Sequence, residues 1–425
     1  MAIYALVILL SASVLALPIS QAQPVSFVDS LFTAASALTI TGLSTVDTAT
    51  VWTPVGQSVI LVLIQLGGIG IMSITTLSFL SAGRATLSME RLYFQELAGS
   101  AKVANALTLV KKIVLVTLLI EAIGVILMYF DLARHLAPTQ AILSAVFHSI
   151  SAFCNAGFAL HSDSYMGYQA DAYFLSVNSA LILAGGLGFL VLVELWDSMR
   201  QRQPNRRYSL HLRLVMRMTV ILVFGGAALL WVTEDFDFIQ ALFHSISSRS
   251  AGFNSLDLST VTLPAISLII LLMYIGTAPG STGGGIKTTS LATLVALGVQ
   301  RFRGENNVTL LKRTIPTNLV IRAVAVALIG ITAVALTTGL LVVFQTLDGP
   351  APSNLLRDAL FEATSAVCTV GLSIGLTSEL TTASKITLIG AMIVGRLGLL
   401  TIAYGLAARP RLDRIKHAEG IPMIG

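Results

Sequence analysis

The sequence predicts an all-α polytopic membrane protein built from four repeats, each with a span, a short re-entrant helix, a hairpin and a second span. Of the 425 residues, 55% are hydrophobic and only 11% are charged, whereas soluble domains carry about 25% charged residues. Eight stretches approach the roughly 20 apolar residues that a membrane span needs. A short segment also recurs four times, which indicates an internal repeat. Together these observations predict eight transmembrane helices plus four re-entrant helices in a pseudo-fourfold arrangement.

The recurring segment begins at a phenylalanine and ends at a glycine that is followed by Phe or Leu. Its copies occupy residues 32–43, 147–158, 243–253 and 361–372. Glycine allows backbone conformations in which successive carbonyls point toward one axis. Four such hairpins from one chain therefore predict the walls of a single pore. Packing loops without a function are the alternative, which is less favoured because irregular backbone at membrane depth normally lines a cavity.

The repeats divide the chain into four parts of one pore-forming domain. Repeat one is 1–82, repeat two with a cytoplasmic linker is 83–200, repeat three with a broken last span is 201–300, and repeat four with a C-terminal tail is 301–425. The first segment resembles a signal peptide but lacks a positive n-region, so we interpret it as a span.

The elements follow in order. Spans are expected near 2–19, 53–80, 110–130, 173–196, 212–232, 262–296, 318–345 and 383–407. The short helices are expected to begin at residues that cap or open a helix, namely Ser26, Pro138, Asp235 or Asp237, and Ser353 or Asn354.

Charge indicates the orientation of the chain. Of the 26 Lys and Arg residues, 20 lie in the segments 82–112, 200–217, 301–322 and 409–416. The positive-inside rule places these segments and the C-terminus in the cytoplasm. Because short basic clusters beside spans are what topology alone requires, nucleic acid is not an expected partner. The two cysteines give no disulfide framework.

The hairpins are the predicted ion site. A dehydrated cation needs a ring of oxygens, and backbone carbonyls can replace its water shell. The short helices direct the negative ends of their dipoles at the same place. The predicted filter residues are Ile40, Thr41, Gly42, Asn155, Ala156, Gly157, Ser250, Ala251, Gly252, Thr369, Val370 and Gly371. Since each copy has one glycine, potassium selectivity over sodium is expected to be real but incomplete.

A second site is predicted in the span at 262–296, where TAPGSTGGGIKTTS cannot hold a regular helix. We interpret this run as a gate across the pore, and it does not match a phosphate loop because Ile286 replaces the glycine before Lys287. Lys287 and Arg396 put cations near the path, although pairing within the bundle is an equal alternative. The gate residues are Gly280, Ser281, Thr282, Gly283, Gly284, Gly285, Lys287 and Arg396.

Three further polar positions have structural interpretations. Arg249 is expected to point behind the filter and pair with Glu362. His148 and His244, which match Glu362 in position, are expected to be hydrogen-bonded core residues and not a metal cluster. Glu121 is expected to have a partner inside the protein.

The motifs APGSTGGGIKTT, FHSISAFCNAGF, SSRSAGFN, TVGLS and GRLG resemble those of the KtrB/TrkH family of bacterial potassium-uptake proteins over nearly the whole chain. The length is closest to that of KtrB. The resemblance implies a homodimer with one pore per subunit in the bacterial inner membrane, and K⁺ as the transported ion at the filter residues. It also implies a cytosolic RCK-type ring, KtrA, that binds ATP or ADP with cyclic di-AMP as a further candidate ligand, and activation by Na⁺. No nucleotide site is evident in the chain itself.

Two other functions are possible. A Na⁺- or H⁺-coupled secondary cation transporter also uses broken helices, but such folds show two related halves and this chain shows four quarters. An intramembrane enzyme would need a nucleophile and base or a metal cluster. Neither is found, so the chain is not expected to be an enzyme.

Overall fold

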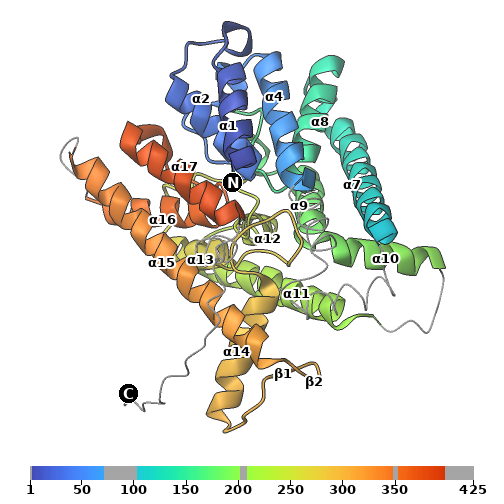
Figure 1. Ribbon diagram of the computed structural model, residues 1–425. Helices are drawn as coiled ribbons and strands as arrows, with labels where there is room; N and C mark the ends of the chain where they lie inside the picture. Colours follow the sequence, from blue (N-terminus) through green and yellow to red (C-terminus); the bar gives the residue numbers. More distant parts are fainter. Residues whose placement is uncertain (1, 71–102, 202–207, 348–352, 398–425) are drawn as a thin grey trace.

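The computed structural model describes residues 2–70, 103–201, 208–347 and 353–397 (Figure 1). Its main elements are helices, apart from a two-stranded hairpin of β1 (Thr309–Leu310) and β2 (Arg313–Thr314). Repeat one contributes α1 (Ala2–Leu15), α2 (Phe27–Thr39), α3 (Thr48–Val51), α4 (Pro54–Gln65) and the π-helix η2 (Leu66–Gly70). Repeat two contributes α7 (Val103–Leu132), α8 (Pro138–Phe153), α9 (Ala172–Gly186) and α10 (Phe189–Gln201). Repeat three contributes α11 (Leu210–Thr233), α12 (Phe238–Ser247), α13 (Leu263–Tyr274) and α14 (Thr288–Phe302). Repeat four contributes α15 (Thr317–Leu347), α16 (Leu355–Val367) and α17 (Thr382–Leu397).

The four short helices α2, α8, α12 and α16 begin close to the residues that the sequence predicted. The Ser26 side chain accepts a hydrogen bond from the Asp29 backbone N–H at 3.1 Å and so caps α2. Pro138 occupies the first turn of α8, where its missing N–H costs nothing. Asp237 precedes α12, and its backbone N–H donates to the Gln240 side chain at 3.2 Å. At α2, α8 and α12 these residues therefore mark where the chain turns into the short helix.

Three of the described helices are long and apolar enough to cross a membrane by length and composition. They are Leu109–Leu132, Leu210–Thr233 and Thr317–Leu347. Large apolar side chains on them remain exposed, among them Leu118, Phe224 and Leu336, which are 52%, 55% and 64% exposed. Their outer faces therefore suit contact with lipid tails better than contact with water.

The predicted span at 173–196 is not one straight helix, because α9 and α10 meet at a bend of 101°, and the pair is apolar and long enough to be one broken span. The bend lies where the chain passes very close to another backbone. A Cβ atom added at Gly185 would lie 1.8 Å from the Phe153 carbonyl oxygen, and Gly188 has φ of +87°. Close approach and positive φ both favour glycine and end the regular helix here. The run GGLG contained this signal.

The other spans agree with the sequence to different degrees. The predicted break in 262–296 is confirmed, since α13 ends at Tyr274 and α14 begins at Thr288. The first helix ends at Leu15, earlier than the predicted residue 19. The predicted spans 53–80 and 383–407 extend beyond the described residues, so their full lengths stay predictions, as does the total of eight.

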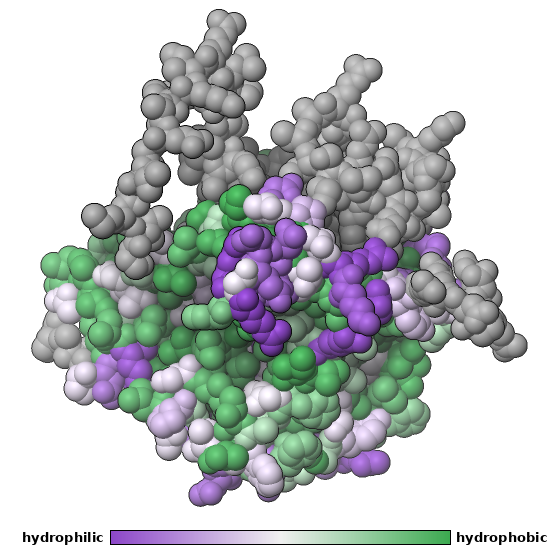
Figure 2. Space-filling view, turned by 90° about the horizontal axis from the view of Figure 1, so that it is seen from below, coloured by the Kyte–Doolittle hydropathy of each residue, from purple (hydrophilic) through white to green (hydrophobic). Residues whose placement is uncertain are grey.

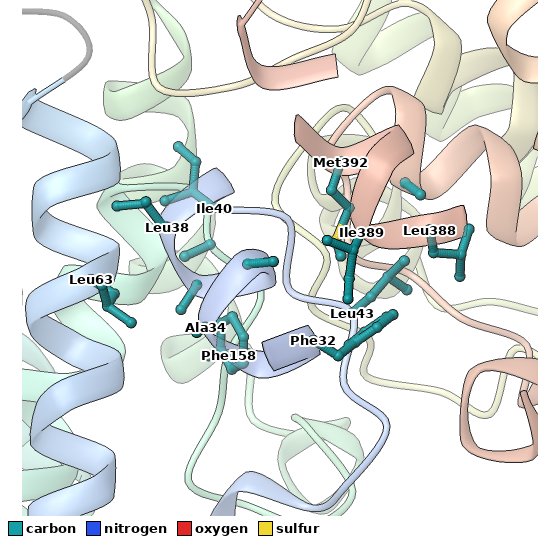
Figure 3. Close-up of a cluster of buried hydrophobic side chains, with 14 of the residues drawn as sticks. Phe32, Ala34, Leu38, Ile40, Leu43, Leu63, Phe158, Leu388, Ile389 and Met392 are labelled. Atoms are coloured by element: carbon teal, nitrogen blue, oxygen red, sulfur yellow. The ribbon is translucent and has the colours of Figure 1, made fainter. Parts of the chain in front are cut away.

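The repeats pack around a shared centre. Each short helix packs on the long helix before it, and α17 of repeat four also packs on α2 of repeat one, which brings the two ends of the described chain together (Figure 1). Figure 3 shows part of this junction, where Phe32 and Leu43 of repeat one lie beside Leu388 and Ile389 of α17. Lys385 Nζ also lies 2.6 Å from Asp29 Oδ1, which links the outer turns of the same two helices.

The end of the molecule at α14 has a different surface. Seen from below, a compact hydrophilic area interrupts a largely hydrophobic surface, on the side where the end of α14 and the β1–β2 hairpin lie (Figures 1 and 2). The segment between them is exposed, and it includes Arg303 and Glu305. This end is one of the predicted cytoplasmic segments, and its orientation stays a prediction.

Candidate functional site

The four hairpins adopt nearly the same backbone conformation. After each short helix, one residue has a positive φ: Ile40 (49°), Asn155 (55°), Ser250 (123°) and Thr369 (49°). Two residues later the glycine again has a positive φ: Gly42 (94°), Gly157 (72°), Gly252 (79°) and Gly371 (99°). Non-glycine residues rarely adopt this region, so its occurrence at one position in all four copies indicates a common built turn.

The four glycines face one another in a closed ring. Atoms placed where a Cβ would stand meet the carbonyl oxygen before the next glycine: Gly42 meets Ala156 at 2.6 Å, Gly157 meets Ala251 at 3.0 Å, Gly252 meets Val370 at 2.3 Å, and Gly371 meets Thr41 at 2.1 Å. The order returns to its starting point, so the four turns converge around one axis. The structure thus brings the four glycines and the residues before them around one axis, and the other four predicted filter residues begin the same turns. The occupancy of that ring by an ion stays a prediction.

A serine in the last turn of each short helix fixes the turn that follows. The Ser36 and Ser365 hydroxyls accept from the backbone N–H of Gly42 and Gly371 at 3.1 and 3.0 Å. The Ser151 hydroxyl donates to the Phe158 carbonyl at 2.7 Å, and Ser247 donates to the Phe253 carbonyl. These serines were not predicted from the sequence, although their spacing was a signal. The serine stands six residues before the glycine in repeats one, two and four, and five residues before it in repeat three.

The irregular segment between α13 and α14 lies directly against this ring. The Asn155 amide donates to Thr282 Oγ1 at 2.7 Å, and the Gly284 N–H donates to Ser250 Oγ at 2.8 Å. The segment also bonds to the bend between α9 and α10, through Ala278 N to the Gly186 carbonyl at 3.1 Å and Phe189 N to the Gly280 carbonyl at 2.9 Å. Many of its backbone groups are therefore satisfied within the protein, as a break predicted at membrane depth requires.

Two cations hold the same segment. Arg396 donates to the carbonyl oxygens of Thr282 and Gly67, the latter at 2.7 Å, and it is only 9% exposed. Lys287 Nζ donates to the Gly283 carbonyl. Neither forms an ion pair within the described part of the chain. Both bond a carbonyl oxygen of the broken helix, and Arg396 also bonds one of η2.

The predicted ion pair between Arg249 and Glu362 is wrong. Arg249 is buried and donates to the Gly276 carbonyl at 3.2 Å, which the end of α13 leaves free. Both carboxylate oxygens of Glu362 accept from hydroxyl groups, those of Ser373 and Thr377. Each group therefore finds partners in its own repeat. The prediction of hydrogen-bonded core histidines is confirmed, because His148 and His244 are fully buried and bonded.

Glu121 has the predicted partner inside the protein. The Gln65 amide donates to Glu121 Oε2 at 3.0 Å, and the carboxylate residue is 4% exposed. We expect Gln65→Leu to cost about 1–3 kcal/mol of stability, because it leaves a buried acceptor without its amide donor. The double substitution Gln65→Leu/Glu121→Leu should cost less. Thermal unfolding of the purified variants checks this, and a double variant less stable than the single one would contradict it.

The chain matches a known family of transport proteins over most of its length. The model of the TrkH family, described as a cation transport protein, matches residues 3–236 and 219–411. The chain belongs to the TrkH family. It is 35% identical to the Ktr system potassium uptake protein B of Vibrio alginolyticus over 99% of this chain and 92% of that protein. It is 33% identical to the potassium/sodium uptake protein NtpJ of Enterococcus hirae, over 99% of this chain and 95% of that one.

A solved structure in the family has the same fold. The potassium transporter TrkH from Vibrio parahaemolyticus matches with a TM-score of 0.73 and 21% identity, over 96% of this chain and 84% of that chain. These relatives are transport proteins, and the prediction that the chain is not an enzyme is confirmed by this membership. The family resemblance seen in the motifs is confirmed as well.

Proposed function

We propose that this TrkH-family protein is the potassium-translocating subunit of a bacterial K⁺ uptake system. The observation that carries the proposal is the closed ring of four glycine turns, in which each missing Cβ faces a carbonyl oxygen of the next repeat. Backbone oxygens around one axis can replace the water shell of K⁺. The names of the relatives, which include potassium uptake proteins and a potassium/sodium uptake protein, agree with this ion.

The ring is proposed to pass K⁺ down its electrochemical gradient. An inside-negative potential supplies about 2.3 kcal/mol per charge for each 100 mV, which is enough to draw K⁺ inward against a sizeable concentration ratio. The four copies differ in sequence, so the oxygen cage is only pseudo-symmetric. We therefore infer partial rejection of Na⁺.

The segment 280–287 is proposed to be the gate. Its hydrogen bonds to Asn155 and Ser250 put it against the ring. Arg396 holds it from the side of repeat four. Movement of the segment away from the ring would open a path toward the end at α14.

The remaining proposals concern assembly and location. We propose a homodimer in the bacterial inner membrane, with the basic loops and the C-terminus in the cytoplasm. Regulation by a cytosolic RCK-type ring that binds ATP or ADP, and activation by Na⁺, are proposed from family membership. Two relatives are named as protein B of a Ktr system, and this wording implies a further component for those proteins.

The test is ⁸⁶Rb⁺ uptake by a potassium-uptake-deficient cell that expresses the chain, followed by flux in proteoliposomes. Uptake above the vector control is expected. In liposomes, Rb⁺ flux should persist without any Na⁺ or H⁺ gradient. The broken helices also suit a Na⁺- or H⁺-coupled transporter, and flux that requires such a gradient would favour that function instead.

A further inference from the structure

One position in the short helices is polar and buried in every repeat, and neither the ring nor the gate uses it. This position directly follows the buried phenylalanine of each copy. The residues that occupy it are Thr33, His148, His244 and Glu362, which are 1%, 0%, 0% and 0% exposed. Burial of a polar group without a hydrogen bond costs about 1–3 kcal/mol. The partners of these side chains therefore indicate what they do.

His148 fastens the chain after Gly157. Its Nδ1 lies 2.8 Å from the Ser144 carbonyl and must donate to it, which leaves Nε2 as an acceptor. Nε2 accepts from the Leu160 backbone N–H at 3.1 Å, three residues after the glycine. His161 stacks on the ring with centroids 4.8 Å apart, and burial lowers the pKa of His161, which favours its neutral form.

Repeats three and four make the same kind of connection. His244 Nε2 lies 3.2 Å from the hydroxyl of Ser255, which is three residues after Gly252. In repeat four the hydroxyls of Ser373 and Thr377, which follow Gly371, donate to the two carboxylate oxygens of Glu362. Two histidines and a glutamate at one position thus bond to the same part of the hairpin. Thr33 differs, because its buried hydroxyl has no hydrogen-bond partner among the described residues.

We propose that His148, His244 and Glu362 are positioning residues that set ion selectivity. The last-turn serines bond each turn at its glycine or at the residue directly after it, and these three side chains hold the chain further along. A turn fixed at both points keeps its carbonyl oxygens at the spacing of the larger ion, whereas a turn fixed at one point can close around Na⁺. The inference rests on the proposed function of the ring and adds the groups that determine its rigidity.

The experiment measures ⁸⁶Rb⁺ and ²²Na⁺ flux in proteoliposomes that contain the purified full-length protein. His148→Phe keeps a ring of similar size but removes the acceptor, whereas His148→Gln can place its Oε1 near the former Nε2. His148→Phe should lower the ratio of Rb⁺ to Na⁺ flux roughly tenfold, the scale of one hydrogen bond, mainly through faster Na⁺ flux. His148→Gln should restore most of the ratio.

Thr33→Val is the matched control, since it changes the same position in the repeat where no bond is made. It should leave the ratio unchanged. His244→Phe and Glu362→Gln test the other two repeats, and both should lower the ratio. If folded His148→Phe, His244→Phe and Glu362→Gln all keep the wild-type ratio, or if none of the three folds, the positioning role is overturned. Absence of Rb⁺ flux in the wild type would instead overturn the proposed function, so the two failures are distinguishable.

Discussion

Gly371→Ala should abolish most ⁸⁶Rb⁺ uptake, with an expected loss of about 100-fold, the scale on which a 1 Å misplacement acts. The added methyl group would lie 2.1 Å from the Thr41 carbonyl oxygen and 3.0 Å from Gly42 Cα. Both are backbone atoms, so no flexible side chain can move aside. The turn of repeat four must shift away from repeat one, and the shift opens the ring at its closing contact.

Gly375→Ala is the matched control for this substitution. Gly375 lies in the same repeat with φ of +110°, close to the +99° of Gly371, but an added Cβ there meets nothing within 4 Å. Both variants therefore strain the backbone, by about 1–3 kcal/mol, and only one of them intrudes on the ring. Uptake per folded protein should be near wild type for Gly375→Ala. Equal loss of uptake in the two variants would attribute the effect to backbone strain and remove the assignment of the ring.

Local sequence patterns predicted the positions of the hairpins and of the short helices. Ser26 and Pro138 are recognisable helix starts, and a glycine that ends a recurring segment marks a turn with positive φ. The convergence of the four turns on one axis depends on contacts between repeats, such as that of Gly252 with Val370. The internal repeat predicted that the four turns share one axis, but it did not predict the distances between them.

The pairing of buried charges was not predictable in the same way. Arg249 and Glu362 appeared complementary because both are charged and both lie near a filter hairpin. In the structure, Arg249 serves the Gly276 carbonyl, which became free only because α13 ends there, and Glu362 serves two nearby hydroxyls. Backbone donors and acceptors that are left free at helix ends compete with ion pairs for buried charged side chains. Residue types alone do not reveal where such free backbone groups lie. The bend at Gly185–Gly188 was missed for a related reason, since its cause is the nearby Phe153 carbonyl.

Arg396→Gln should raise K⁺ flux several-fold, because it weakens the link that holds the segment 280–287 under the ring. The guanidinium bonds to Thr282 of that segment and to Gly67 of repeat one at the same time. Glutamine is shorter and has one amide donor group in place of the fork, so it cannot serve both carbonyls. The substitution also removes a positive charge beside the proposed path, where it would repel a passing cation by an energy that grows as the local dielectric falls. Both effects act in the same direction.

Lys385→Gln controls for loss of a basic residue from the same helix. Lys385 is also on α17, but its ammonium pairs with Asp29 at the opposite end of that helix from Arg396. Its loss should cost about 1 kcal/mol of stability at most, as for other partly exposed pairs, and leave the flux per folded protein unchanged. ⁸⁶Rb⁺ flux into proteoliposomes, normalised to monodisperse protein, compares the two variants with the wild type. A folded Arg396→Gln protein with wild-type or lower flux would mean that the segment is a structural kink, because a barrier held by Arg396 must weaken when that side chain is replaced.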